Sequence, residues 1–260
     1  MVREISLFVN QRTNGISRDF LLAVIAQIIN YTGDYIIIWL FLRKFDTLAG
    51  WSWPEIALLY SLGLFTYALG ASFSFVQMRE LESQVKNGTF DSILIKPVNP
   101  YLYIVCRGFN LGYLAHVAIS GSVLLWALFK LNLSLSWVEV VYLILCIIGG
   151  AMIQAGFMSV IGAVSFVWVK TNFLFTLFFK FKEFVSYPLP VFGTFIQVLL
   201  TFVIPFAFIN FYPAAFLLTK ETALLSSWTM WLVPIMGPLC YFLGYRIWMS
   251  SVNRYQGAGG

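Results

Sequence analysis

Long apolar runs separated by short polar connections dominate the pattern along the chain. Runs of about 20 apolar residues, the length at which a helix crosses a bilayer, cover residues 20–42, 54–76, 109–129, 138–167 and 228–249. Backbone groups in lipid must be hydrogen-bonded within their own segment, so each run is predicted to be a helix. With one more span in the block 173–218, the pattern predicts an all-α integral membrane protein with six transmembrane helices.

The block 173–218 allows two interpretations. In the first, residues 172–188 form the fifth span and residues 189–218 form a re-entrant hairpin on the outer side. In the second, residues 170–184 lie along the inner surface and residues 187–210 span. The first places three charged residues inside the membrane, which is costly, and the second avoids that cost; they are Lys180, Lys182 and Glu183. Under both interpretations no uninterrupted helix runs through the block, because each of four prolines removes a backbone donor: Pro188, Pro190, Pro205 and Pro213.

Composition strengthens the membrane assignment. The 260 residues are 60% hydrophobic and only 10% charged, whereas soluble domains are about a quarter charged. The net charge of +5 reports which loops face the cytoplasm and does not indicate nucleic-acid binding. The three cysteines lie scattered in apolar runs and define neither a disulfide framework nor a metal site.

The basic residues orient the chain. They are in excess before the first predicted span, around the second connection and beside the last span, which places both termini in the cytoplasm. The first 20 residues mix apolar and basic positions, as in an amphipathic helix lying on the inner leaflet; a disordered start is the alternative. We predict one transmembrane domain over residues 1–250 and a loose C-terminal tail over residues 251–260.

A polar connection interrupts the apolar pattern between the second and third spans. Residues 77–88 are rich in helix formers, and Gly88 is a natural helix stop. The prolines of "KPVNP" then favour extended backbone. The sequence therefore predicts a short helix lying across the membrane face, followed by a stiff elbow. Such an element either docks a cytosolic partner or is merely an ordered loop.

Three segments of the chain resemble the permease subunits of bacterial ABC-2 type exporters, and the nearest branch is the viologen-exporter-like one. The segments are "GWSWPEIALLYSLGLFTYAL", "VKNGTFDSILIKPVNP" and "FVIPFAFINFYPAAFLL". The second matches the family pattern at Lys86, Gly88, Phe90, Asp91, Leu94, Lys96, Pro97, Asn99 and Pro100.

The resemblance implies a transport subunit in the bacterial cell membrane that pairs with a second permease chain, identical or homologous. Two cytosolic ATPase subunits, which carry ATP and Mg²⁺, would drive export of a lipophilic or cationic compound, or a lipid, by alternating access. It also implies the re-entrant interpretation and makes the polar connection a coupling helix. The candidate ATPase-coupling residues are Arg79, Glu80, Glu82, Lys86, Gly88, Phe90, Asp91, Lys96 and Pro97.

Motifs for chemistry within this chain are lacking. It contains no G-x-x-x-x-G-K-[ST] phosphate-binding loop, no zinc-hydrolase motif and no G-x-S-x-G. We therefore expect a transport subunit with no cofactor of its own, and not an enzyme. The alternative is an ATP-independent secondary transporter or a structural membrane partner.

Within the spans, two titratable residues are candidates for a substrate path. Asp34 could attract a cation, pair with His116 or Arg107, or simply meet water near the outer interface. His116 is either a core residue or a proton carrier. Pro188, Pro190, Pro205 and Pro213 are candidates for a gate. Small residues at four-residue spacing in the fourth span are predicted to allow close helix packing: Ala151, Ala155, Ser159 and Ala163.

Overall fold

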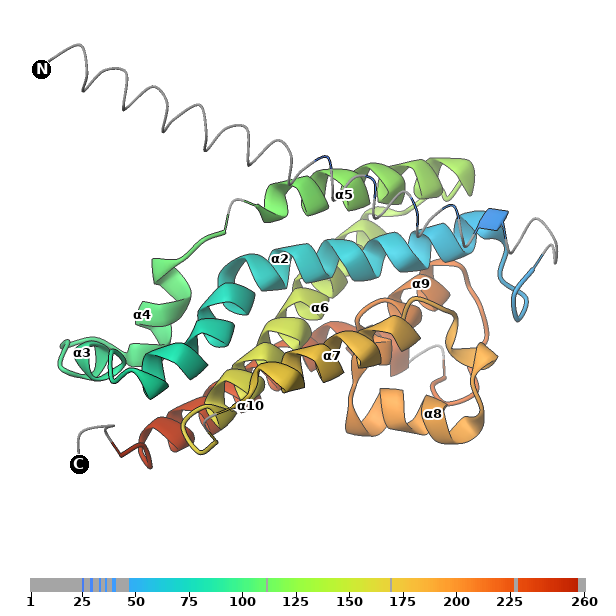
Figure 1. The fold of residues 1–260 in the computed structure, drawn as a ribbon. Helices are drawn as coiled ribbons and strands as arrows, with labels where there is room; N and C mark the ends of the chain where they lie inside the picture. The colour runs from blue at the N-terminus through green and yellow to red at the C-terminus, as the bar shows by residue number, and fades with distance from the viewer. Residues whose placement is uncertain are drawn as a thin grey trace, which may run out of the picture.

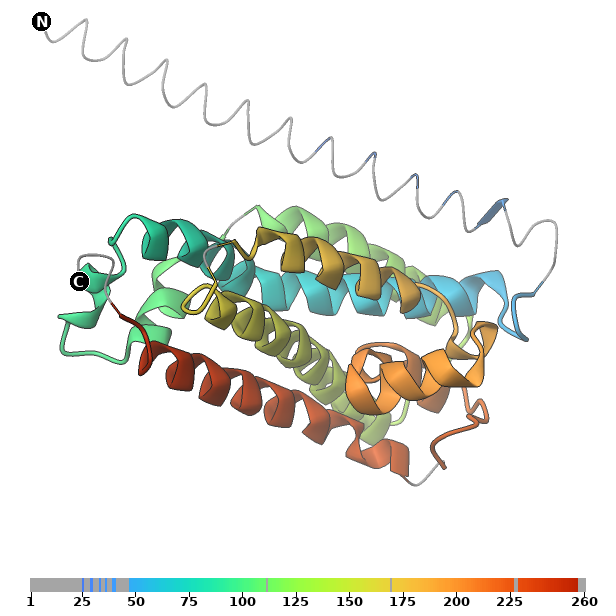
Figure 2. The ribbon, with the colours of Figure 1, turned by 60° about the horizontal axis from the view of Figure 1, so that its bottom comes forward.

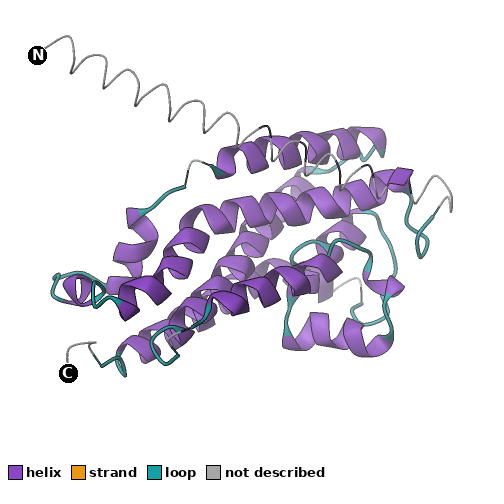
Figure 3. Cartoon of the chain, in the orientation of Figure 1, coloured by secondary structure: helices purple, strands orange, loops and turns teal. Residues whose placement is uncertain are grey.

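The computed structural model describes residues 47–110, 112–168, 170–226 and 229–256, and six single residues between 25 and 40. Those six are helical and fall in the first expected span: Ile25, Ile29, Gly33, Ile36, Trp39 and Leu40. The rest of that span, the expected N-terminal interfacial helix and Asp34 lie outside the described residues. Within the described residues the regular structure is helical, apart from one isolated bridge between Leu48 and Trp51 (Figure 3). The prediction of an all-α membrane protein is confirmed.

Four described helical segments are long and apolar enough to cross a membrane, and each coincides with a predicted run. They are α2 (Trp53–Lys86), α5 (Tyr113–Lys130), α6 (Trp137–Val164) and the segment Thr229–Val252, which combines η4 (Thr229–Leu232) with α10 (Val233–Val252). A bent pair of shorter helices in the block 173–218 could supply one more. Six spans remain a prediction.

Close glycine contacts fix how α6 packs between α2 and α10. A Cβ atom built on Gly237 of α10 would lie 2.2 Å from the Cα of Gly149 in α6, and one on Gly244 would lie 2.6 Å from the carbonyl oxygen of Gly156. On the other side, a Cβ on Gly70 of α2 would lie 2.5 Å from the carbonyl oxygen of Ala151. The residue numbers rise together along each pair, so α2, α6 and α10 run parallel (Figures 1 and 2).

The helix α7 (Asn172–Phe184) lies against α2 and does not lie flat at one end of the bundle. Phe175 packs on Phe75, with ring centroids 5.5 Å apart, whereas Phe179, one turn further on, packs on both Phe75 and Tyr67. This order makes α7 antiparallel to α2 along the bundle axis (Figure 2). The geometry favours the first of the two interpretations. The 13 residues of α7 extend only about 20 Å as helix, so α7 alone is shorter than the roughly 30 Å hydrocarbon core.

Residues 189–218 form a bent element that stays at one end of the bundle. It comprises η1 (Leu189–Val191), α8 (Thr194–Val198), η2 (Leu199–Val203), η3 (Phe206–Phe208) and α9 (Phe211–Leu217). The two halves meet at an angle of 78°, beside Pro205, where the helical hydrogen bonding is interrupted. The element lies at the end opposite α3 and α4 (Figure 1). We call it the re-entrant element, because neither half reaches the other end.

The polar connection differs from its prediction. Residues 77–86 do not form a separate helix across the membrane face; they are the last turns of α2, which runs for 34 residues. Met78 and Leu81 are fully buried in these turns, and a Cβ on Gly162 of α6 would lie 2.9 Å from the Met78 sulfur. Packing against α6 therefore stabilises the continuation of α2 through these residues. The sequence has no helix-breaking residue here before Gly88, whose φ of +68° is incompatible with a continued helix.

The chain remains packed against the bundle beyond residue 250, where the loose tail is predicted to begin. α10 continues to Val252, and the Tyr255 ring packs edge-on against Phe90 and Phe166, with centroids 5.4 and 5.7 Å away. Aromatic packing therefore holds this part of the chain against the bundle. Residues 257–260 lie outside the described residues.

Candidate functional site

The candidate coupling region is an elbow that we define as residues 87–99. It contains α3 (Asp91–Leu94) and leads into α4 (Pro100–Arg107), which precedes α5. Its tip carries three exposed apolar side chains, Leu94, Ile95 and Val98, and Ile95 is 84% exposed. Lys96 and Pro97 between them are also exposed. An apolar tip that is rimmed by polar groups is typical of a surface that contacts a protein or a membrane.

One aromatic residue anchors the start of the elbow. Phe90 is completely buried, with its ring centroid 4.8 Å from Phe166 after α6 and 6.3 Å from Trp248 in α10. Buried aromatic pairs of this kind contribute about 0.5–1.5 kcal/mol each beyond the area they bury. Phe90 therefore ties the elbow to two long helices at once.

A second anchor lies in the first turn of α4, directly after the elbow. Tyr101 is 1% exposed; its hydroxyl lies 2.9 Å from the Ser159 hydroxyl of α6, and its ring packs edge-on against Trp248 and Tyr245 of α10. Asn99 caps α4 by accepting a hydrogen bond from the Leu102 N–H, and its amide donates to the Tyr245 hydroxyl at 3.0 Å. The elbow is thus held at both ends against α6 and α10 while its tip stays exposed.

Two of the predicted coupling residues, Glu82 and Arg79, make polar contacts with the start of α7. The Glu82 carboxylate accepts hydrogen bonds from the backbone N–H groups of Thr171 and Asn172, at 2.6 and 2.8 Å, and so caps α7. A carboxylate at a helix N-terminus is favourable because the free N–H groups carry partial positive charge. Arg79 donates a hydrogen bond to the Asn172 side chain at 3.3 Å. α2 and α7 are therefore linked at this end, and replacing Glu82 would also loosen α7.

Lys96 has a partner on α4. Its ammonium donates a hydrogen bond to the Tyr103 hydroxyl, and this bond lowers the pKa of the phenol from its ordinary value. The contact ties the exposed elbow to α4. The other predicted coupling residues divide by exposure: Glu80 and Lys86 are exposed, whereas Gly88 and Asp91 are half-buried.

Polar side chains also gather within the bundle, around His116, which the sequence marks as a candidate for the substrate path. The Tyr67 and Tyr113 hydroxyls are 3.4 Å apart, and the His116 ring lies 5.0 Å from the Tyr113 ring. The Lys182 ammonium from α7 lies 3.5 Å above the Tyr67 ring, a cation–π contact. Lys180 and Glu183 form an exposed ion pair at 2.7 Å. α2, α5 and α7 thus bring four polar or titratable side chains together.

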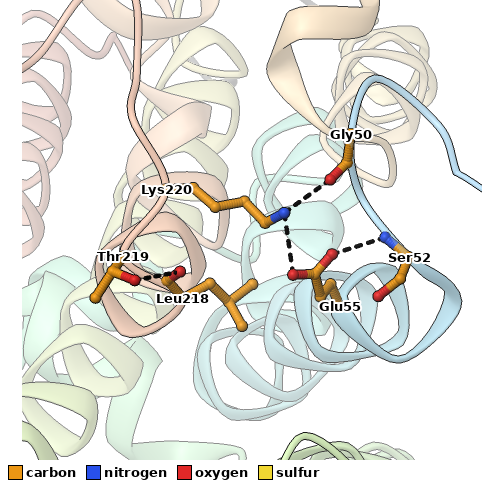
Figure 4. Close-up of polar contacts among 6 residues, drawn as sticks. All are labelled: Gly50, Ser52, Glu55, Leu218, Thr219 and Lys220. Atoms are coloured by element: carbon orange, nitrogen blue, oxygen red, sulfur yellow. Dashed lines mark hydrogen bonds and ion pairs between the residues drawn. The ribbon is translucent and has the colours of Figure 1, made fainter.

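An ion pair between the residues just after the re-entrant element and the start of α2, which we call the latch, joins these two parts of the chain (Figure 4). The Lys220 ammonium lies 3.0 Å from the Glu55 carboxylate and donates to the Gly50 carbonyl at 2.8 Å. The other Glu55 oxygen accepts from the Ser52 N–H at 2.7 Å. The two side chains are only 23% and 17% exposed, so solvent screens their attraction little.

We expect the Lys220→Met variant to be destabilised. It leaves the Glu55 carboxylate poorly compensated in a mostly buried position, at a cost of about 2 kcal/mol. Thermal unfolding in detergent measures the loss as a lower midpoint. Combining Lys220→Met with Glu55→Gln should cost less than the sum of the two single changes, and strict additivity would contradict the latch.

The predicted gate prolines all lie in or beside the re-entrant element. Pro188 and Pro190 flank Leu189 of η1, Pro205 lies at the bend, and Pro213 lies in the first turn of α9. Sequence reasoning missed Asn210, which is 1% exposed and donates to the carbonyls of Leu59 and Val185. It joins the re-entrant element to α2 and to the end of α7. An amide within the apolar run "FAFINFY" is the signal that could have found it.

The predicted packing residues lie along α6. Ala155 and Ala163 are buried, Ala151 contacts Gly70 of α2, and Ser159 contacts Tyr101. In the part of the chain that the structure describes, no three His, Cys, Asp or Glu residues gather where they could hold a metal ion.

Comparison with known proteins adds one match. The model of a family described as "ABC-2 family transporter protein" matches residues 28–259. No curated protein and no solved structure matches the chain. The matched region includes the elbow, the re-entrant element and the polar side chains within the bundle, Tyr67, Tyr113, His116 and Lys182.

Proposed function

The chain belongs to the ABC-2 transporter family, and from this premise we propose that it is the permease subunit of an ATP-driven exporter whose elbow receives the movement of the ATPases. At the level of the family, it is a multi-pass membrane transport subunit. The resemblance to ABC-2 permeases is confirmed, whereas the viologen-exporter-like branch remains a prediction.

The observation that carries the proposal is the anchored elbow. Its exposed apolar tip offers a contact surface, while Phe90 and Tyr101 bury its two ends against α6 and α10. A displacement of the elbow tip cannot be taken up by flexibility of the connection, because both ends of the elbow are packed on helices. The movement therefore passes to α6 and α10, which are themselves in backbone contact at Gly149 and Gly237.

In this proposal the energy comes from other chains. Two cytosolic ATPase subunits bind ATP and Mg²⁺ and contact the elbow, and a second permease chain, identical or homologous, completes the membrane unit. The elbow end of the bundle and both termini then face the cytosol of a bacterial cell. Transport proceeds by alternating access, and ATP shifts the equilibrium only through contacts that differ between the two states.

The proposed substrate is a lipophilic or cationic compound, or a lipid, which passes between the two permease chains. The re-entrant element would form the outer gate, with the latch and Asn210 holding it against α2. Asp34, His116 and Lys182 supply the candidate titratable groups of the path.

An Ile95→Asp variant tests the proposal. Ile95 makes the tip apolar and is 84% exposed, so the substitution should leave folding intact. With the partner ATPase in liposomes, we expect the ATPase rate that the permease stimulates to fall at least about tenfold, the factor that corresponds to about 1.4 kcal/mol of lost contact energy.

The matched control is Asn253→Asp, which adds the same charge just after α10, outside the elbow. It should keep wild-type stimulation. Full stimulation by Ile95→Asp, with the complex intact, would remove the elbow as the contact site and would favour a transporter that needs no ATPase.

A further inference from the structure

The ion pair between Lys180 and Glu183 lies on the exposed face of α7, whereas the buried face carries Phe175 and Phe178. The Lys180 ammonium lies 2.7 Å from the Glu183 carboxylate, and the two side chains are 65% and 63% exposed. Such a pair is common where a protein surface meets water, and it contributes little to stability there. A charged pair inside a membrane needs a cover of protein or water, so the depth of this pair decides what can lie against it.

The charged residues of α2 limit where the hydrocarbon core can lie. α2 has no Asp, Glu, Lys or Arg between Glu55 and Arg79, and this uncharged stretch is about 35 Å long as helix. At its Glu55 end, the rings of Trp53 and Trp126 pack together with centroids 6.4 Å apart, as in the aromatic belts at membrane interfaces. The hydrocarbon core, roughly 30 Å thick, therefore lies within the uncharged stretch.

Two contacts place the ion pair within that layer. Before the pair along α7, Phe179 packs edge-on against Tyr67, with ring centroids 5.9 Å apart. After the pair, Val185 lies beside Leu59, because the Asn210 amide donates to the carbonyls of both residues, at 2.7 and 3.0 Å. Tyr67 and Leu59 are about 18 and 6 Å along α2 from its first charged residue. The ion pair lies between these two levels and is therefore inside the hydrocarbon core.

Acyl chains are a poor cover for this face of α7, because charged side chains are costly in lipid. The exposed residues recur along the face at steps of three and four, the spacing with which one helix packs against another: Phe173, Leu177, Lys180 and Glu183. Phe173 and Leu177 are 57% and 48% exposed, so the stripe is apolar beside its two charges. A mixed stripe of this kind fits another protein helix better than a water-filled space.

The stripe is complementary to itself in charge, since it carries one ammonium and one carboxylate. In a dimer with two-fold symmetry the same patch of both subunits meets, so Lys180 of each chain can pair with Glu183 of the other. We propose that α7 packs against α7 of a second copy of this chain, where two lysines and two glutamates form one cluster shielded from lipid. The inference rests on the proposed function and deepens it, because it makes the partner permease an identical chain and names the surface through which the two chains meet.

Charge reversal tests the pairing between chains. Two copies of the full-length chain with different affinity tags are co-expressed, and the amount of one copy that is recovered with the other is measured in mild detergent. Lys180→Glu leaves only negative charges in the stripe, and Glu183→Lys leaves only positive ones. We expect the recovery of each variant with itself to fall at least about tenfold, because like charges repel strongly in a medium of low dielectric constant. Co-expression of the two different variants should restore recovery to within about twofold of wild type, since every pair across the contact is again opposite in charge.

The double variant Lys180→Glu/Glu183→Lys is the control for folding, because it keeps one charge of each sign. It should associate with itself like the wild type. Lys130→Glu reverses an exposed charge at the end of α5, outside the stripe, and should leave association unchanged. Restoration by mixing the two single variants also separates lost pairing from misfolding, because two misfolded chains would not recover one another.

Wild-type recovery of either single variant with itself would overturn the proposal and would leave the stripe facing water or another part of its own chain. Wild-type chains that do not recover one another, or single variants that fail to recover each other, would overturn it as well. Association is measured on the permease without any ATPase. Its failure therefore leaves the Ile95 result standing, and a failed Ile95 test leaves the association result standing.

Discussion

A Phe90→Ala variant is expected to lose both stability and coupling. The ring is completely buried and contacts Phe166, Trp248 and Tyr255, and truncating a buried Phe costs about 3–5 kcal/mol. The elbow would then be held only at its Asn99–Tyr101 end, so a displacement of its tip would be transmitted poorly to α6 and α10. We expect the unfolding free energy of the detergent-solubilised chain to fall by about 4 kcal/mol, and ATPase stimulation to be lost.

The Phe90→Leu variant is the matched control, because it keeps an apolar anchor at this position. It keeps an apolar side chain of similar length, so the loss of stability should be about 1 kcal/mol and stimulation should largely survive. If Phe90→Ala kept full stimulation at a temperature where it is folded, the anchor would have no part in coupling.

The second large effect is expected at the contact between α6 and α10. The Cβ of a Gly237→Ala variant would lie 2.2 Å from the Gly149 Cα, and backbone cannot move aside as a side chain can. The two helices must separate along their whole contact, because a second close approach, between Gly156 and Gly244, lies two turns further along them. We expect a loss of about 3 kcal/mol or more, seen as aggregation during purification or a much lower unfolding midpoint.

Gly121→Ala in α5 is the control for that prediction. Its Cβ would meet only the Phe65 ring, at 3.2 Å, and an aromatic side chain can shift by a few tenths of an ångström. This variant should purify like wild type. Equal behaviour of the two variants would contradict the close backbone packing of α6 on α10.

The helices that span could be predicted from the sequence, because the thickness of the hydrocarbon core sets the length of an apolar run. The end of α2 could not. Residues 77–86 are polar enough to suggest a surface helix, and only the packing of Met78 and Leu81 shows that they continue α2. The block 173–218 stayed open for the same reason: the direction of α7 depends on Phe75 and Tyr67, which lie some hundred residues earlier in the chain.

The candidate site could be predicted in outline but not in its contacts. The family pattern pointed to Phe90 and Lys96, yet burial of one and exposure of the other follow from tertiary packing alone. Glu82 looked like a surface charge and instead caps α7. The latch was missed because Glu55 and Lys220 lie 165 positions apart in the chain, and each alone is an ordinary charge at the end of an apolar run.

Photo-crosslinking from position 95 in native membranes tests the central claim most directly. A photoreactive amino acid replaces Ile95 in one sample and Trp137 in the other. Trp137 is equally exposed but lies at the far end of the bundle. Mass spectrometry identifies the molecule attached at each position. The account predicts an ATPase with a phosphate-binding loop attached at position 95 and absent at position 137. Attachment of lipid alone at position 95, or equal attachment of the ATPase at both positions, would contradict it.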